Sequence, residues 1–197
     1  MTIGGLERTI TDVLVHARTA GGKSFDAVLH SDTPSVNLDF AGGEGMAVPA
    51  YLGLGVEHIL AGADHLLFVL GLMMLVGFNW RLVWVVTSFT AGHSITLAAS
   101  TLGFVRAPVA TIEALVALSI VFVARELLRG DRTTLTARKP WMIALLFGLL
   151  HGFAFAGALA ETGLPHEDIP LALLLFNLGV EAGQLVFVGA VLAAMLA

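Results

Sequence analysis

The sequence has no cysteine and few charged residues, and each absence limits what the protein can be. Without cysteine, the chain can form no disulfide, no cysteine-bound iron–sulfur cluster and no thiolate metal site. Charged residues make up 13% of the 197 residues, whereas soluble domains carry about 25%. Hydrophobic residues make up 57%, and the mean hydropathy is +0.88. The composition therefore excludes an ordinary water-soluble domain and predicts an all-α polytopic membrane protein within a lipid bilayer.

The first 48 residues are polar and differ from the rest of the chain. Two β-rich runs, 11–18 and 23–30, flank Ala20-Gly21-Gly22, and a Gly-Gly pair between such runs is typical of a hairpin. This stretch is too short for a good core of its own. We therefore expect 1–48 to be a short extracytoplasmic β-rich segment, either the end of a larger β domain or a cap on the membrane part. We expect 49–197 to be the transmembrane helical domain.

Long apolar runs follow from Pro49 onward, separated by short polar connections. Each run can supply the roughly 20 residues that a helix needs to cross a bilayer. Proline stands at or beside the first turn of four runs, where its missing N–H would have no helical partner. None falls inside a run, so we expect continuous helices. The sequence predicts a bundle of about five transmembrane helices, at roughly 49–76, 82–103, 108–128, 140–160 and 169–196.

The basic residues indicate an orientation. Most of them gather in the connection after the third run: Arg125, Arg129, Arg132, Arg138 and Lys139. Arg81, between the first two runs, lies on the same side of the bundle. The positive-inside rule puts this side in the cytoplasm, with the N-terminus outside and the C-terminus cytoplasmic. A single cytoplasmic cluster gives no support for nucleic-acid binding. The chain begins without a signal peptide and stops within an apolar run, so we expect a fragment or a short version of a longer protein.

Every predicted span carries an ionisable residue, and every span except the third has a histidine or carboxylate near its middle or outer half. Each ionisable group costs a few kcal/mol at bilayer depth on insertion scales. So many of them in one chain therefore indicate a role for these residues. Interhelical hydrogen bonds are the alternative to a shared functional site. The residues are Glu57, His58, Asp64 and His65 in the first span, His93 in the second, Glu113 in the third, His151 in the fourth, and Asn177, Glu181 and Gln184 in the fifth.

Spacing limits how the residues of the first span can meet. His58 and His65 are seven residues apart, as are Glu57 and Asp64, so each pair lines one helix face. A straight helix would separate the partners by about 10 Å. That is too far for both histidines to reach one ion, since zinc–nitrogen bonds are about 2.1 Å. The sequence predicts two levels of an ion path, unless Gly62 permits a local bend.

Glycines flank two of the polar positions. Gly148-Leu-Leu-His-Gly152 and Gly179-Val-Glu-Ala-Gly183 are GxxxG motifs, which let helix backbones approach closely in lipid. His151 lies at the edge of its glycine face, so we expect it in a tight seam between helices. Glu181 points away from Gly179 and Gly183, toward a different neighbour.

Four stretches resemble the HupE/UreJ family of bacterial membrane proteins. The most specific runs from Gly55 to Leu70 and carries an H-x5-D-H core, and the others are 89–97, 147–157 and 176–184. The resemblance covers about residues 50–195. The family is regarded as nickel or cobalt permeases, which implies a bacterial inner-membrane location. Its members carry a longer exported domain before the first span and a further helix after the fifth, so the resemblance implies that we should expect both to be shortened here. The resemblance implies metal contacts at His58, Asp64, His65, His93, His151 and Glu181, with Glu57, Glu113, Asn177 and Gln184 as supporting polar residues.

Three functions fit these residues. The leading hypothesis is a permease for a divalent transition metal, since imidazole and carboxylate ligands suit nickel, cobalt or zinc and the affinity order cannot choose between them. The second is an intramembrane zinc hydrolase, with Glu57 or Glu113 as the general base. The third is a metal-binding or structural subunit of a larger membrane complex, or of a homo-oligomer. The sequence shows no ATP-binding loop, so gradients or partners would drive transport.

Overall fold

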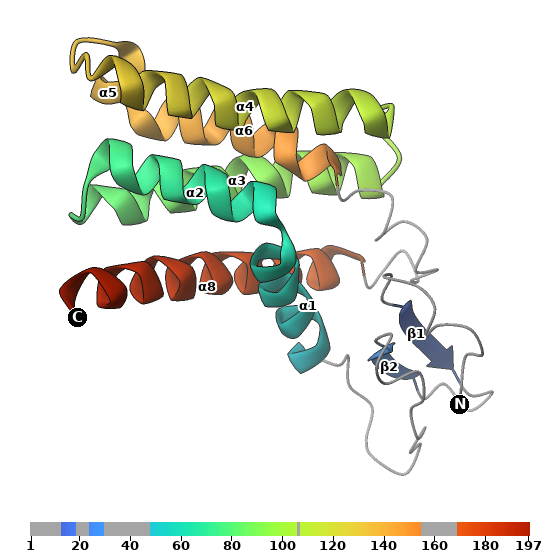
Figure 1. Cartoon of the computed structure of the whole chain (residues 1–197). Helices are drawn as coiled ribbons and strands as arrows, with labels where there is room; N and C mark the ends of the chain where they lie inside the picture. Colours follow the sequence, from blue (N-terminus) through green and yellow to red (C-terminus); the bar gives the residue numbers. More distant parts are fainter. Residues whose placement is uncertain (1–12, 19–23, 30–47, 106, 155–168) are drawn as a thin grey trace.

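The computed structural model describes residues 13–18, 24–29, 48–105, 107–154 and 169–197, and its main body is helical (Figure 1). The helices α2, α3, α4, α6 and α8 lie side by side as a bundle, and α1 crosses the bundle on the side of α8. The most extensive helix contacts are those of α3 with α6 and of α1 with α8. The helices are α1 (Val48–Ala61), α2 (Ala63–Val76), α3 (Arg81–Thr101), α4 (Val109–Arg129), α5 (Leu135–Arg138), α6 (Pro140–Ala154) and α8 (Ile169–Leu196).

The first predicted span is not a continuous helix. Residues 49–76 form the end-to-end pair α1 and α2, which meet at an angle of 73°. Gly62 N donates to His58 O and Gly62 O accepts from Leu66 N, both at 3.1 Å, so the chain turns between two hydrogen-bonded helices. The expectation of continuity is wrong here, because a helix can also kink at glycine and the packing of α1 across α8 sets its direction.

Two described helices, α3 and α8, are long and apolar enough to cross a bilayer on their own, and the bent pair α1–α2 makes a third if it counts as one span. The apolar helix α6 has 15 residues, so it is only about 22 Å long. The last residues of the predicted fourth span lie outside the described residues. By length and composition the structure supports two or three spans, and the count of five stays a prediction.

Two short strands precede the helices. β1 (Val13–Arg18) pairs antiparallel with β2 (Ser24–Leu29), with Val13 opposite Leu29 and Arg18 opposite Ser24. The connection between them, 19–23, contains the Gly-Gly pair and lies outside the described residues. β2 also contacts α1. The position of this segment outside the membrane stays a prediction.

Glycines line both of the extensive helix contacts. A Cβ on Gly148 of α6 would collide with the backbone of Phe89 in α3, and one on Gly92 would collide with the backbone of Leu145. In the other contact, a Cβ on Gly179 of α8 would collide with the backbone of Leu52 in α1. Gly152 and Gly183 lie in the same two seams. The predicted role of both GxxxG motifs is confirmed: they let these helices touch through their backbones.

Apolar side chains cover the outside of the bundle as well as its inside. Phe68, Phe89 and Phe176 are fully buried, whereas Leu67 and Leu118 are more than half exposed. Exposed apolar patches of this extent are not left in contact with water in soluble monomers. The outer surface therefore fits a hydrocarbon surrounding.

We predict that Gly148→Leu separates α3 from α6 and lowers thermal stability, because the backbone of Phe89 cannot move aside as a side chain would. Overpacking of this kind costs about 1–3 kcal/mol. The melting temperature of the protein in detergent, followed by tryptophan fluorescence, should fall. Gly189→Leu is the matched control, since a Cβ there meets nothing within 4 Å. Equal melting temperatures for the two variants would contradict the proposed tight seam.

Candidate metal centre

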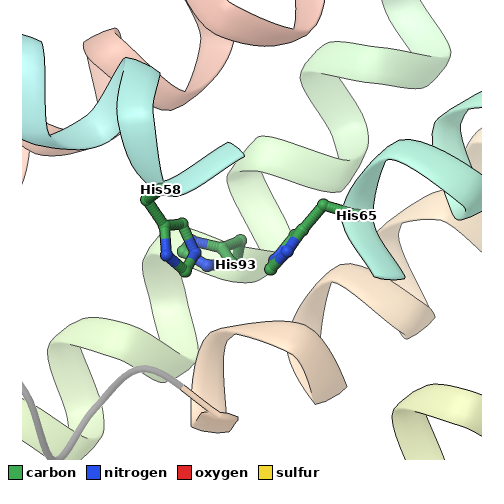
Figure 2. Close-up of side chains that lie close together, drawn as sticks. All are labelled: His58, His65 and His93. Carbon is green, nitrogen blue, oxygen red and sulfur yellow. The ribbon is translucent and has the colours of Figure 1, made fainter. Parts of the chain in front are cut away.

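Four histidines from four helices meet beside the break between α1 and α2. The ring centroids of His58 and His65 are 4.7 Å apart, those of His65 and His151 are 4.9 Å apart, and those of His58 and His93 are 5.7 Å apart. Figure 2 shows the rings of His58, His65 and His93 turned toward one another. His93 and His151 are fully buried, and His65 is 3% exposed. The bundle therefore gathers imidazole groups in its interior.

The break at Gly62 brings His58 and His65 together. His58 lies in the last turn of α1, and His65 lies in the first turn of α2. The expectation that they form two separate levels is wrong, and the bend at Gly62 that the sequence left open is confirmed. Gly62 also leaves space for the side chains around it: a Cβ there would lie 2.6 Å from His65 Nδ1 and 3.1 Å from Asp64 Oδ1. Gly62 thus shapes the centre as well as the chain.

The ligand atoms form two overlapping groups. The donor atoms of His58, His65 and His93 lie within 4.8 Å of one another, and so do those of Asp64, His65 and His151. Ligands at about 2.1 Å from one metal ion are at most about 4.2 Å apart. Small side-chain movements would therefore let either group hold an ion. His65 is common to both groups.

Each of three histidines has one ring nitrogen beside an oxygen and the other nitrogen without a partner among the described residues. The unpartnered, buried atoms are Nε2 of His65, Nε2 of His93 and Nδ1 of His151. A buried polar atom left without a hydrogen bond costs about 1–3 kcal/mol, and a bound cation would remove that cost. The oxygen contacts are His65 Nδ1 to Asp64 Oδ1 (3.1 Å), His93 Nδ1 to Asn177 Oδ1 (3.3 Å) and His151 Nε2 to Ser119 Oγ (3.2 Å).

Further hydrogen bonds decide which nitrogen carries the proton. Ser119 Oγ donates to Val116 O at 2.6 Å, so it accepts from His151 Nε2–H and leaves a lone pair on Nδ1. Asn177 Nδ2 donates to Leu173 O at 2.8 Å, which turns its Oδ1 toward His93 as an acceptor. The Asp64 carboxylate likewise accepts from His65. A histidine that binds a metal through one ring nitrogen is held in this way by a hydrogen bond from its other ring nitrogen. The arrangement therefore fits a transition-metal ion.

Glu181 and Gln184 form a separate polar level between α8 and α3. Thr87 Oγ1 donates to Glu181 Oε1 at 2.6 Å, and Thr90 Oγ1 donates to Gln184 Oε1 at 3.0 Å. Along α3, Thr90 and Thr87 are about one and two turns from His93, or roughly 4.5 and 9 Å. Glu181 Oε2 and Gln184 Nε2 are buried and have no partner among the described residues. As the spacing predicted, Glu181 faces a neighbour other than the one its glycines contact.

The structure thus brings together His58, Asp64, His65, His93 and His151, with Asn177 supporting His93, and it leaves Glu181 outside both groups. Glu57 and Glu113 are exposed and belong to neither group. Sequence reasoning missed the role of Ser119, which holds His151 from α4. A hydroxyl residue in the middle of an apolar run was its only signal.

Comparison with known proteins gives a family match. The HupE/UreJ protein family matches residues 36–197, a range that contains α1 through α8 and all four clustered histidines. No curated protein and no solved structure matches the chain. The four stretches that resemble the family, including the H-x5-D-H core, lie within the matched range. The match covers most of the sequence, and the chain belongs to the HupE/UreJ family.

Proposed function

We propose that this chain carries a divalent transition-metal ion, nickel or cobalt, across the bacterial inner membrane. The observation that carries the proposal is the histidine cluster: in His65, His93 and His151, one ring nitrogen lies beside an oxygen, and the other is buried and has no hydrogen-bond partner among the described residues. Membership of the HupE/UreJ family is consistent with metal transport. The ion is the substrate of the protein, and the histidines and Asp64 would replace part of its water shell.

One ion at a time would occupy the centre. The groups His58–His65–His93 and Asp64–His65–His151 share His65, and two divalent ions so close together would repel each other strongly. An ion could pass from the first group to the second while His65 stays bound to it. A transport site must bind its ion firmly enough to select it and loosely enough to release it. A site of nitrogen and oxygen ligands without thiolates is compatible with that requirement.

Glu181 would take the ion after the histidines. It follows Asn177 along α8, and the C-terminal end of α8 lies at the end of the bundle where α3 begins (Figure 1). Its buried Oε2 has no partner among the described residues, and a cation would supply one. With the basic connection placed in the cytoplasm by the positive-inside rule, the ion would move inward from the histidines to Glu181.

The alternative functions have less support. An intramembrane zinc hydrolase needs a general base at the metal, but Glu57 and Glu113 are exposed and lie outside both groups. The carboxylate in the groups, Asp64, is engaged by His65. A metal-binding subunit of a larger complex would use the same centre without moving the ion. Uptake into vesicles separates that role from a permease.

We predict that His65→Ala abolishes stoichiometric nickel or cobalt binding, because it removes the ligand common to both groups. His93→Ala and His151→Ala each leave one group whole, so they should bind more weakly but measurably. Loss of an outer hydrogen bond alone costs about 10–100-fold in affinity, and loss of His65 should cost more. Elemental analysis and titration calorimetry measure this, with His16→Ala on β1 as the control. Unchanged metal content in His65→Ala would refute the centre.

We predict that Glu181→Gln keeps metal bound at the histidines but slows uptake into proteoliposomes at least about tenfold. A tenfold slower rate corresponds to a barrier raised by about 1.4 kcal/mol, a modest cost for the loss of one charged contact with the moving ion. The amide has the shape of the carboxylate without its charge. Glu113→Gln, an identical change at an exposed position outside both groups, should transport like the unaltered protein. Wild-type vesicles that bind metal without accumulating it would exclude a permease and leave the subunit role.

We predict that Gly62→Ala weakens metal binding although it removes no ligand. The new methyl group would collide with His65 Nδ1 and crowd Asp64 Oδ1, so the two side chains must turn away. The expected loss in metal affinity is about tenfold or more, comparable to the loss of a hydrogen bond that orients a metal ligand. Gly53→Ala in the preceding helix α1 is the control, since a Cβ there meets nothing within 4 Å. Equal affinities for the two variants would show that the space at Gly62 is irrelevant to the centre.

A further inference from the structure

A second feature lies at the end of the bundle where α3 and α6 begin and α4 ends (Figure 1). It is a pocket of about 880 Å³ between α2, α3, α4 and the segment that carries α5. None of the clustered histidines lines it. Its walls combine arginine side chains with tryptophan rings and apolar residues, a mixture unlike that of the metal centre.

Three arginines give this pocket a surplus of positive charge. Arg81, Arg132 and Arg138 line it, and all three are exposed. None of them has an ion pair with a residue in the described ranges. They reach the pocket from α3, from the connection after α4 and from α5. Three guanidinium groups are thus brought to one cavity from three separate places in the chain.

The two acidic residues of the pocket already have partners. Glu126 is buried, and its Oε1 lies 3.7 Å from Arg125 Nη1 and 3.9 Å from Arg129 Nη1, two arginines that do not line the pocket. Asp131 Oδ1 accepts from Thr133 N at 2.8 Å and from Thr133 Oγ1 at 2.7 Å. These hydrogen bonds hold the pKa of the Asp131 carboxyl below its usual value. Glu126 is thus countered by arginines outside the pocket, whereas the Asp131 carboxylate stays ionised and offsets one of the three positive charges, which leaves the pocket a positive surplus.

Tryptophans place this end of the bundle at the membrane surface. The sequence has three of them, and Trp80, Trp84 and Trp141 all lie at the beginning of α3 or α6. Trp84 and Trp141 line the pocket and are 64% and 47% exposed. Exposed indoles are enriched at the level of lipid headgroups. Met74, 67% exposed, adds an apolar wall on the same pocket.

We propose that this pocket binds the phosphate of an anionic phospholipid such as phosphatidylglycerol. Arg81, Arg132 and Arg138 surround the phosphate, because guanidinium groups donate paired hydrogen bonds to phosphate oxygens. Trp84 and Trp141 lie against the glycerol and the first part of the acyl chains. Basic pockets between helices on the cytoplasmic side are typical sites for anionic headgroups. A free phosphate ion would leave the apolar walls and both indoles without a partner, so the lipid is the better fit.

A bound lipid would connect elements that protein contacts alone join weakly. It would link the start of α3 to the connection after α4 and to α5, next to the start of α6. The proposal is independent of metal transport, since the pocket and the histidines share no residue.

The experiment compares two neighbouring residues of one connection. Arg138 lines the pocket, whereas Lys139 is exposed and does not. Native mass spectrometry of the protein in detergent, titrated with phosphatidylglycerol, gives the affinity of each variant. We expect Arg138→Ala to weaken binding about fivefold, the usual effect of one basic residue near a lipid surface, and Arg132→Ala/Arg138→Ala to weaken it further. Lys139→Ala should stay within about twofold, since its charge is only near the site.

Three outcomes would overturn the proposal. Phosphatidylcholine binding as tightly as phosphatidylglycerol would remove the role of the charge. Lys139→Ala weakening binding as much as Arg138→Ala would reduce it to the general charge of the connection. Displacement of phosphatidylglycerol by a modest concentration of inorganic phosphate would reassign the pocket to the free ion. A melting temperature in detergent that is unchanged in Arg138→Ala serves as the folding control.

Discussion

Helix backbones touch at glycines in two seams, and the rest of the molecule is arranged around these contacts. Gly92 and Gly148 bring α3 against α6, while Gly55 and Gly179 bring α1 against α8. In lipid no hydrophobic force pushes helices together, so close van der Waals packing must do so. The first seam fixes where His93 and His151 emerge, and the second carries α1 across the bundle. The histidine cluster lies where the two seams come together.

The break between α1 and α2 is the second consequence of this packing. With α1 held across α8, the chain must turn by 73° to enter α2. Gly62 allows the turn and leaves room for the side chains of Asp64 and His65. Those two residues then lie in the first turn of α2, where the free N–H groups of a helix favour a carboxylate. A feature of helix packing thereby becomes a feature of ligand geometry.

Hydrogen bonds in the interior then orient the ligands. Asn177, Ser119 and Asp64 each engage one nitrogen of a histidine ring, and they come from α8, α4 and α2. Such bonds are strong in a low-dielectric surrounding, and an unpaired polar atom there is correspondingly costly. The other nitrogen of each of these rings has no partner in the part of the chain that the structure describes, and these atoms are therefore what a metal ion would stabilise. This is why the centre, rather than the exposed glutamates, carries the proposed function.

Composition and spacing were enough to predict the membrane character, the residues that match the family and the role of the GxxxG motifs, because these depend on residue type and helical period alone. They also predicted that Glu181 faces away from Gly179 and Gly183. They failed where long-range packing decides. The sequence left the bend at Gly62 open, since neither glycine nor the absence of proline sets the angle between helices. It could not show that His65 joins both ligand groups, that Ser119 holds His151, that Glu181 stands apart from the histidines, or that three distant arginines share a pocket. A helical period fixes which residues share a face, but the distance between residues on different helices depends on how those helices cross, and only the tertiary structure supplies that.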